Sequence, residues 1–222
     1  MDGSVLEHRP SWPRWSDTLS DTAATNHVVY FDLDVKSWVT AMPGVREARP
    51  ACCPRCRTPS VLPDERIVLH GHGVRERQHW GPPEPEAAAE IGSLIERRYR
   101  CTECNAVIVV RPRGVLPHRR YNAAAIALAL WLWAIELASD RSVREKTSPQ
   151  PTTGMSRPER WTTLRRWAKA ARDGNLWPRV RADASWTLRQ CAERAARVIA
   201  GWADTAIACD RQRVFLGAAR IR

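Results

Sequence analysis

The sequence lacks the features of an exported or membrane-spanning protein. Its N-terminus has no charged segment followed by an apolar run and a small-residue cleavage site. Its most apolar stretch, residues 123–138, has 16 residues, contains Glu136 and is flanked by basic residues on both sides. A membrane span needs about 20 residues and a one-sided charge bias. We therefore expect a cytoplasmic protein in which this stretch is a buried core helix, with a membrane helix as the weaker alternative.

Acidic residues are too few to balance the basic ones. The chain of 222 residues has 24 Asp and Glu against 35 Lys and Arg, a net charge of +11. Most of this surplus lies between Arg111 and Arg181, where 15 Lys and Arg accompany 5 Asp and Glu. Each cation that neutralises a phosphate releases condensed counterions. The charge therefore favours a polyanionic partner such as duplex DNA, although an anionic membrane surface would also attract the chain.

The cysteines lack the even number of a disulfide framework, and their placement suits metal ligation better. There are seven cysteines, and four of them form two C-x-x-C doublets, Cys53 with Cys56 and Cys101 with Cys104. Four thiolates can complete one tetrahedral shell around a structural Zn²⁺ and leave no open position for a catalytic water. No βαβ pattern accompanies either doublet, so thioredoxin-like chemistry is disfavoured.

Other ligand sets are compatible with the same sequence. Iron would accept the same four thiolates. Cys52 could replace Cys53, although the 53 and 56 spacing matches that of the second doublet. His70 or His72 could replace a thiolate, but a place in a surface turn is the simpler interpretation.

The first half of the chain predicts a tail and a β-rich domain. Residues 1–26 are polar and show no sustained periodicity of apolar residues, so they predict a disordered tail. Residues 27–113 predict a β-rich zinc-ribbon domain with a tight turn at 70–73, an exposed loop at 78–86 and an insertion around 79–92. The expected strands cover residues 28–35, 67–69, 74–77, 94–100 and 106–110, with a short helical turn at 36–42.

The second half predicts helices, so the expected fold class is α+β. Residues 114–182 predict a helix-turn-helix DNA-binding domain with helices at 122–138, near 142–147 and at 158–172. Ser156 and Glu159 suggest a capping box for the third helix, and Gly174 suggests its end. Residues 183–222 predict an amphipathic helix over 185–209 and a basic tail over 211–222. This helix could pack on the helical domain or form a homodimer with a second copy.

The third predicted helix has an apolar face and a cationic face. Trp161, Leu164, Ala168 and Ala171 share the apolar side, and the opposite side is cationic. A solvated face is the default interpretation of such a pattern, but the local charge surplus favours contact with DNA. The eleven tryptophans are expected mainly in the core, with Trp80 as the one candidate for base stacking. The candidate DNA-binding residues are Arg157, Arg160, Thr162, Arg165, Arg166, Lys169 and Arg172, together with Arg75, Arg77, Arg119 and Arg120.

The order of motifs over about residues 50–175 resembles a known module. C-P-R-C, H-G-H-G-V-R-E-R, R-R-Y-R-C-T-E-C and T-T-L-R-R-W follow one another, as in the N-terminal DNA-binding part of bacterial insertion-sequence transposases. They are also similar to a mobile-element-associated bacterial family of zinc-ribbon and helix-turn-helix proteins. The resemblance implies binding to terminal inverted repeats, with Thr162, Arg165 and Arg166 at bases or phosphates.

The resemblance does not extend to catalysis. Transposases of this kind need an RNase-H-like domain with three metal-binding carboxylates, and the sequence after Arg172 predicts helix with no strand framework. We therefore expect a non-enzymatic accessory factor of a mobile element or a transcriptional regulator. The alternatives are the DNA-binding part of a truncated or split transposase, working with a transposase or recombinase subunit, and a zinc-ribbon protein-interaction module.

Overall fold

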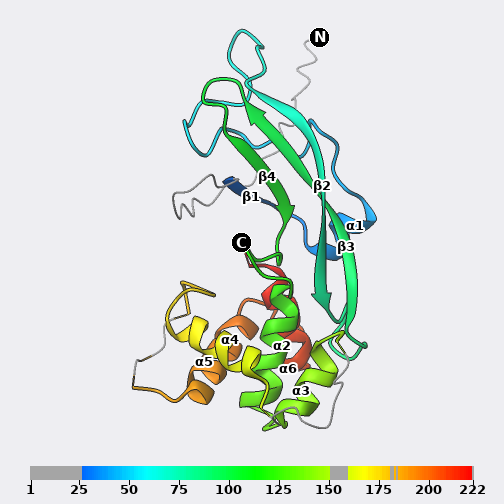
Figure 1. Ribbon diagram of the computed structural model, residues 1–222, viewed down its shortest axis with the longest axis vertical. Helices are drawn as coiled ribbons and strands as arrows, with labels where there is room; N and C mark the ends of the chain where they lie inside the picture. Colours follow the sequence, from blue (N-terminus) through cyan, green and yellow to red (C-terminus); the bar gives the residue numbers. More distant parts are fainter. Residues whose placement is uncertain (1–26, 151–159, 181–182, 184, 222) are drawn as a thin grey trace, which may run out of the picture.

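The fold is α+β, with a sheet at one end of an elongated molecule and helices at the other (Figure 1). The computed structural model describes residues 27–150, 160–180, 183 and 185–221. The predicted tail at 1–26 and the predicted capping box at Ser156 and Glu159 lie outside these ranges.

Four strands form one sheet in the order β1-β4-β3-β2. β2 pairs with β3 and β3 with β4 in antiparallel fashion, whereas β1 is parallel to β4. The short helix α1 packs on one face, where Trp38 is buried and its ring lies 5.7 Å from that of Phe31. These elements are β1 (His27–Phe31), α1 (Val35–Thr40), β2 (Leu69–Gly81), β3 (Glu90–Cys101) and β4 (Val107–Pro112).

The predicted tight turn at residues 70–73 is wrong, because β2 runs straight through it. The register between β2 and β3 shifts between Gly71 and Val74, which is a β-bulge, and Gly73 supplies the positive φ of 76° that a bulge accommodates. The predicted loop at 78–86 is wrong in its first half, since β2 continues to Gly81. The expected insertion around 79–92 is therefore the far end of a long β2–β3 hairpin.

The helical layer is built around α2. All twelve residues of α2 are buried, as expected for a helix that is apolar on every side. Asn122 begins it by accepting a hydrogen bond from the Ala125 N–H, 2.7 Å away. The predicted core helix is therefore confirmed, and no helix in the described ranges is long and apolar enough to cross a membrane. The helices are α2 (Ala123–Ala134), α3 (Asp140–Thr147), α4 (Thr162–Arg172), α5 (Leu188–Ala200) and α6 (Asp210–Ala219).

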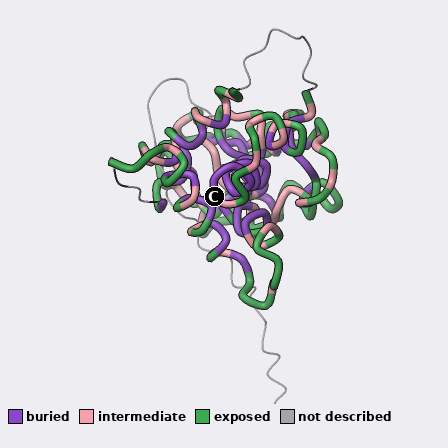
Figure 2. The backbone as a smooth tube through the Cα atoms, turned by 90° about the horizontal axis from the view of Figure 1, so that it is seen from below, coloured by how far each residue is buried: buried purple, intermediate pink, exposed green. Residues whose placement is uncertain are grey.

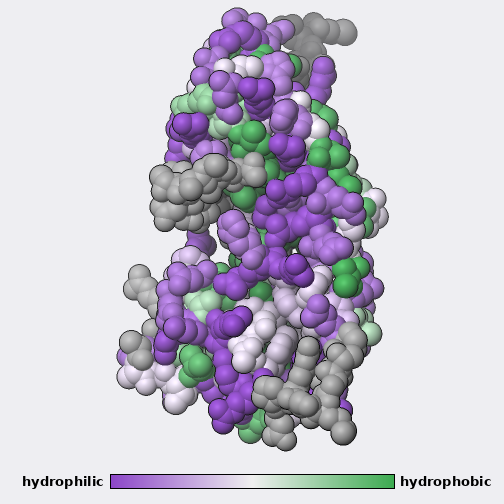
Figure 3. All heavy atoms as spheres, viewed as in Figure 1, coloured by the Kyte–Doolittle hydropathy of each residue, from purple (hydrophilic) through white to green (hydrophobic). Residues whose placement is uncertain are grey.

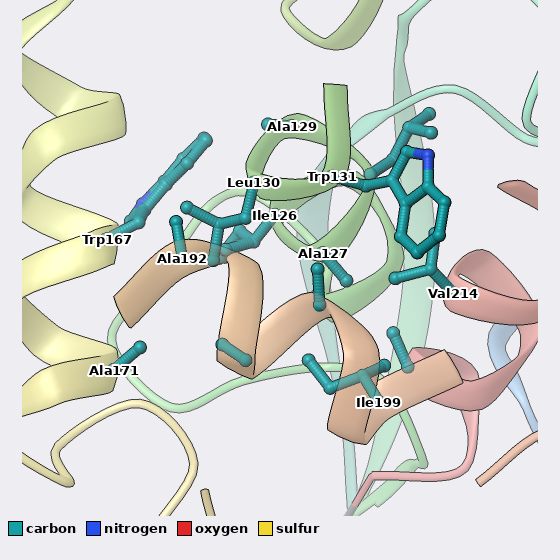
Figure 4. Packing of buried hydrophobic residues seen from close by; sticks show 14 of the residues in the cluster. Ile126, Ala127, Ala129, Leu130, Trp131, Trp167, Ala171, Ala192, Ile199 and Val214 are labelled. Carbon is teal, nitrogen blue, oxygen red and sulfur yellow. The ribbon is translucent and has the colours of Figure 1, made fainter. Parts of the chain in front are cut away.

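α4, α5 and α6 pack on α2 through small and aromatic residues (Figure 4). Trp167 and Ala171 of α4 approach α5 at Ala192, and Ile199 of α5 lies toward α6. Viewed from below, the buried residues gather at the centre with exposed loops around them (Figure 2). α4 ends as predicted, since Gly174 has a φ of 72° and the Asn175 N–H bonds the Ala170 carbonyl at 2.8 Å.

The C-terminal prediction needs correction. One helix was expected over 185–209, but α5 ends at Ala200 before Gly201, and α6 occupies the expected basic tail. α6 forms because Val214, Phe215 and Ala218 are buried in the same core as α2. The apolar face of α5 packs on α2, α4 and α6 within this chain, the first of the two arrangements that the sequence allowed.

The end of the β2–β3 hairpin is fixed to the helices. Trp80 bridges to Tyr121, and their rings meet edge to face at 5.4 Å. Arg211 of α6 binds Glu86 at 2.9 Å and Glu136 at 2.5 Å. The sheet and the helical layer are therefore joined by both apolar and ionic contacts.

Candidate functional site

The four doublet cysteines come together in space. The sulfurs of Cys53, Cys56, Cys101 and Cys104 all lie within 4.8 Å of one another. Cys53 Sγ is 3.6 Å from Cys104 Sγ, and Cys56 Sγ is 3.7 Å from Cys101 Sγ. Disulfide sulfurs would be about 2.05 Å apart, so these are free thiols, close enough together to hold one metal ion.

The two doublets share one backbone conformation. The Cys53 carbonyl accepts the Arg57 N–H at 2.9 Å, and the Cys101 carbonyl accepts the Asn105 N–H at 2.9 Å. Arg57 and Asn105 have positive φ values of 64° and 59°, and each directly follows the second cysteine of its doublet. Each C-x-x-C segment is thus a tight turn that directs both sulfurs to one side. The first turn precedes β2, and the second joins β3 to β4.

Burial and hydrogen bonding set the ionisation of these thiols. Burial raises the pKa of the Cys53 thiol to about 12, against hydrogen bonds from the Cys56 and Arg55 backbone. Burial also raises the pKa of Cys101. Hydrogen bonding to Thr58 lowers the pKa of Cys56 to about 6. Burial therefore disfavours the thiolate form of Cys53 and Cys101, and a cation bound among the four sulfurs would favour it.

The alternative ligands lie outside this cluster. In the described part of the chain, the only group of potential metal ligands is formed by the four cysteines. His70 Nε2 lies 2.8 Å from the Ile67 carbonyl oxygen, and Cys52 forms a β-bridge with Pro59. The choice of Cys53 over Cys52 that the matched spacing favoured agrees with this geometry.

α4 presents a cationic face to solvent. Leu164, Trp167, Ala168 and Ala171 are buried, while Thr162, Arg166 and Lys169 are exposed and Arg160 is exposed just before the helix. Arg160, Arg166 and Lys169 form no ion pair within the described ranges. Arg157 lies outside those ranges.

Two candidate arginines of α4 are engaged within the protein. Arg165 forms an ion pair with Asp140, and its guanidinium lies 5.5 Å from the Trp133 ring centroid. Asp140 also accepts the Trp161 N–H at 2.7 Å, so one carboxylate holds the start of α4 against α3. Arg172 pairs with Asp173 at 3.2 Å. Arg165 therefore positions the helix, which the spacing of the sequence did not reveal.

The described ranges leave the predicted turn between α3 and α4 open. α3 ends at Thr147 and α4 begins at Thr162, and residues 151–159 between them lie outside the described ranges. α4 also begins at Thr162, four positions later than predicted, with Trp161 at the N-cap and no side-chain cap. The orientation of α4 therefore depends on its buried face and on Asp140.

The candidate arginines of β2 gather around a carboxylate that the sequence did not single out. Glu96 is fully buried, with Arg75 Nε 3.0 Å from Oε2 and Arg111 Nε 2.9 Å from Oε1. Arg77 Nε lies 3.9 Å from the same carboxylate, and its Nη2 donates to the Arg119 carbonyl at 2.6 Å. The signal for this cluster was the alternation of β3, which puts Glu96 on the same side as the buried Leu94.

Arg119 and Arg120 lie in the connector between the sheet and α2. Arg119 is half-buried, and burial lowers the pKa of its guanidinium. Arg120 is exposed, 5.1 Å above the Trp80 ring. Trp80 is only 7% exposed, so it cannot stack on a base as the sequence allowed.

Comparisons with protein families, with characterised proteins and with solved structures find no match to this chain.

Proposed function

We propose that this protein binds duplex DNA through the exposed face of α4 and that Zn²⁺ at the four cysteines stabilises its sheet. The observation that carries the DNA proposal is the contrast between the two faces of α4. The inner face is fixed in the core, and the outer face leaves Arg160, Arg166 and Lys169 without a carboxylate partner among the described residues. Each such cation can neutralise a phosphate and release condensed counterions.

The cysteine geometry supports zinc. Four sulfurs at about 2.3 Å from a zinc ion lie about 3.8 Å apart in a regular tetrahedron, close to the 3.6 Å and 3.7 Å between sulfurs of opposite doublets. Zn²⁺ prefers such closed thiolate shells in structural sites. Four protein ligands leave no position for substrate, so we assign this site a role in folding.

The major groove of B-DNA admits an α-helix, and the exposed cations of α4 support the proposal that this helix enters it. Thr162 and Arg166 lie near the N-terminal half, where they would meet base edges or phosphates, and Lys169 follows one turn later. An accessory or regulatory role at a mobile element, as the motif order implies, is part of this proposal. No specific observation favours catalysis or a protein partner over DNA.

The test removes the two cations of α4 that have no carboxylate partner in the described part of the chain. Arg166→Ala combined with Lys169→Ala should weaken binding to a mixed-sequence duplex by about tenfold or more, which is about 1.4 kcal/mol. The readout is fluorescence anisotropy of a labelled duplex, with the full chain at constant salt. The matched control is Arg197→Ala combined with Arg213→Ala, since these arginines already pair with Glu193 and Asp210. If the two double variants bind the duplex with equal affinity, α4 is not part of the DNA interface.

A further inference from the structure

The face of the sheet opposite α1 carries an excess of arginine. Tyr99 and Cys101 of β3 point into the core beneath α1, so the alternation of the strand directs Arg98 and Arg100 to the other face. The pairing registers place Arg75 and Arg111 on that face too, beside Glu96. Between Leu94 and Cys101, Glu96 is the only acidic residue of β3.

Among the described residues, the charge of this face is only partly neutralised. Glu96 forms ion pairs with Arg75, Arg77 and Arg111, so one negative charge meets three positive ones. Nε of Arg77 and Nη1 of Arg111 are buried and have no hydrogen-bond partner among the described residues. Positive charge therefore remains on and beneath this face, where low dielectric strengthens its field.

Arg98 and Arg100 add further accessible positive charge to this face. Arg100 is exposed and donates to the Asn105 side-chain oxygen at 3.3 Å, and Arg98 is half-exposed. Neither forms an ion pair among the described residues. They lie two residues apart on a central strand, about 6.6 Å along it, and their rigid guanidinium forks suit bidentate contact with phosphate oxygens. Hydrophilic residues also cover much of the sheet and helices in the view of Figure 3.

We propose that Arg98 and Arg100 form a second phosphate-binding surface, which contacts the backbone of the same DNA duplex that α4 binds. This inference rests on the proposed function. The contacts between the hairpin end and the helical layer, through Trp80, Tyr121 and Arg211, hold the two surfaces at a fixed separation. Once the duplex is bound at one surface, its effective concentration at the other is high, so two weak contacts add to the overall affinity.

The chemistry of this face favours duplex over single-stranded nucleic acid. Proteins that bind single strands stack bases on exposed aromatic side chains. The aromatic residue paired with Arg111 is Tyr30, which is half-buried and donates its hydroxyl to the Val115 carbonyl at 3.1 Å. No exposed aromatic side chain lies on this face among the described residues. This face therefore contacts the sugar–phosphate backbone and not the bases.

The experiment compares Arg98→Ala/Arg100→Ala with the wild-type protein and with the Arg197→Ala/Arg213→Ala control, all as full chains. Anisotropy of a labelled mixed-sequence duplex is measured over a salt series. Losing two phosphate contacts should make the slope of log K against log salt less negative by about 1.8. The control should keep the wild-type slope, and a single strand of equal length should bind more weakly than the duplex.

The outcomes separate this inference from the proposed function. If the Arg98/Arg100 variant keeps the wild-type salt slope while the Arg166/Lys169 variant binds the duplex more weakly, the second surface is refuted. α4 then remains the interface. Absence of wild-type binding to DNA overturns both. Tighter binding of the single strand overturns the assignment to duplex backbone. Metal content and circular dichroism equal to wild type establish that the arginine variants are folded, and a milder Arg98→Gln/Arg100→Gln pair replaces them if they are not.

Discussion

Replacing Cys53 with serine should unfold the sheet and leave the helical layer folded. Cys53 is fully buried and provides one of the four clustered sulfurs. The hydrophobic cluster under the sheet contains Cys53 and Cys101 among its ten buried residues, whereas the cluster around α2 contains none of the four. The loss should therefore be confined to the first cluster.

The expected magnitude is set by the metal. Structural zinc contributes about 10–16 kcal/mol of apparent binding free energy in zinc-finger peptides, and the net stability of a whole domain is about 5–15 kcal/mol. Loss of one thiolate ligand removes enough of this free energy to unfold the small sheet core. A chelator in excess should have the same effect on the wild-type protein.

The assay is amide hydrogen exchange followed by peptide, with metal content measured in parallel. Peptides from β3 and β4 should lose protection in Cys53→Ser, while α2 should keep it. Cys209→Ser is the matched control, because Cys209 is exposed and outside the cluster. A wild-type protein that purifies without metal, or a Cys53→Ser variant that keeps both metal and β-strand protection, would refute the reasoning.

Three further changes test the helical layer. Trp167→Ala should lower the free energy of unfolding by about 3–5 kcal/mol in denaturant titrations, since this 3% exposed ring packs between α4 and α2. Gly217→Ala should lower the melting temperature, because an added Cβ would lie 2.0 Å from the Ile199 carbonyl oxygen and force α5 and α6 apart. Arg211→Ala should cost on the order of 1 kcal/mol at neutral pH. In the wild-type protein, the hydrogen bonds of Arg211 hold the pKa of Glu136 below the usual 4.5. This stabilisation is present above pH 4.5 and is lost as the pH falls through the lowered pKa, so acid titration of unfolding should make variant and wild type converge.

Local patterns predicted the parts of the fold that local chemistry decides. The cysteine doublets were identified because a C-x-x-C turn sets its own geometry. α2 was identified because an unbroken apolar run can only be buried. β2 was misjudged because two glycines and two histidines suggest a turn, whereas pairing with β3 absorbs the extra residues as a bulge.

Long-range contacts decided what the sequence could not show. Arg165 has the spacing of a surface cation, yet Asp140 and Trp133 hold it within the protein. Glu96 gathers arginines from two other strands, and their convergence depends on strand order. The weak pattern of residues 211–222 predicts a tail, whereas packing of Val214, Phe215 and Ala218 in the core of α2 and α5 stabilises α6 as a helix.

Salt-titrated binding of the wild-type protein to duplex DNA is the most direct test of the central claim. Arg160, Arg166 and Lys169 at α4 and Arg98 and Arg100 on the sheet predict five phosphate contacts. The slope of log K against log salt should therefore be about −4.5. Tight binding at low salt that falls along this slope agrees with the account. No binding at low salt, or an affinity that salt leaves unchanged, contradicts it.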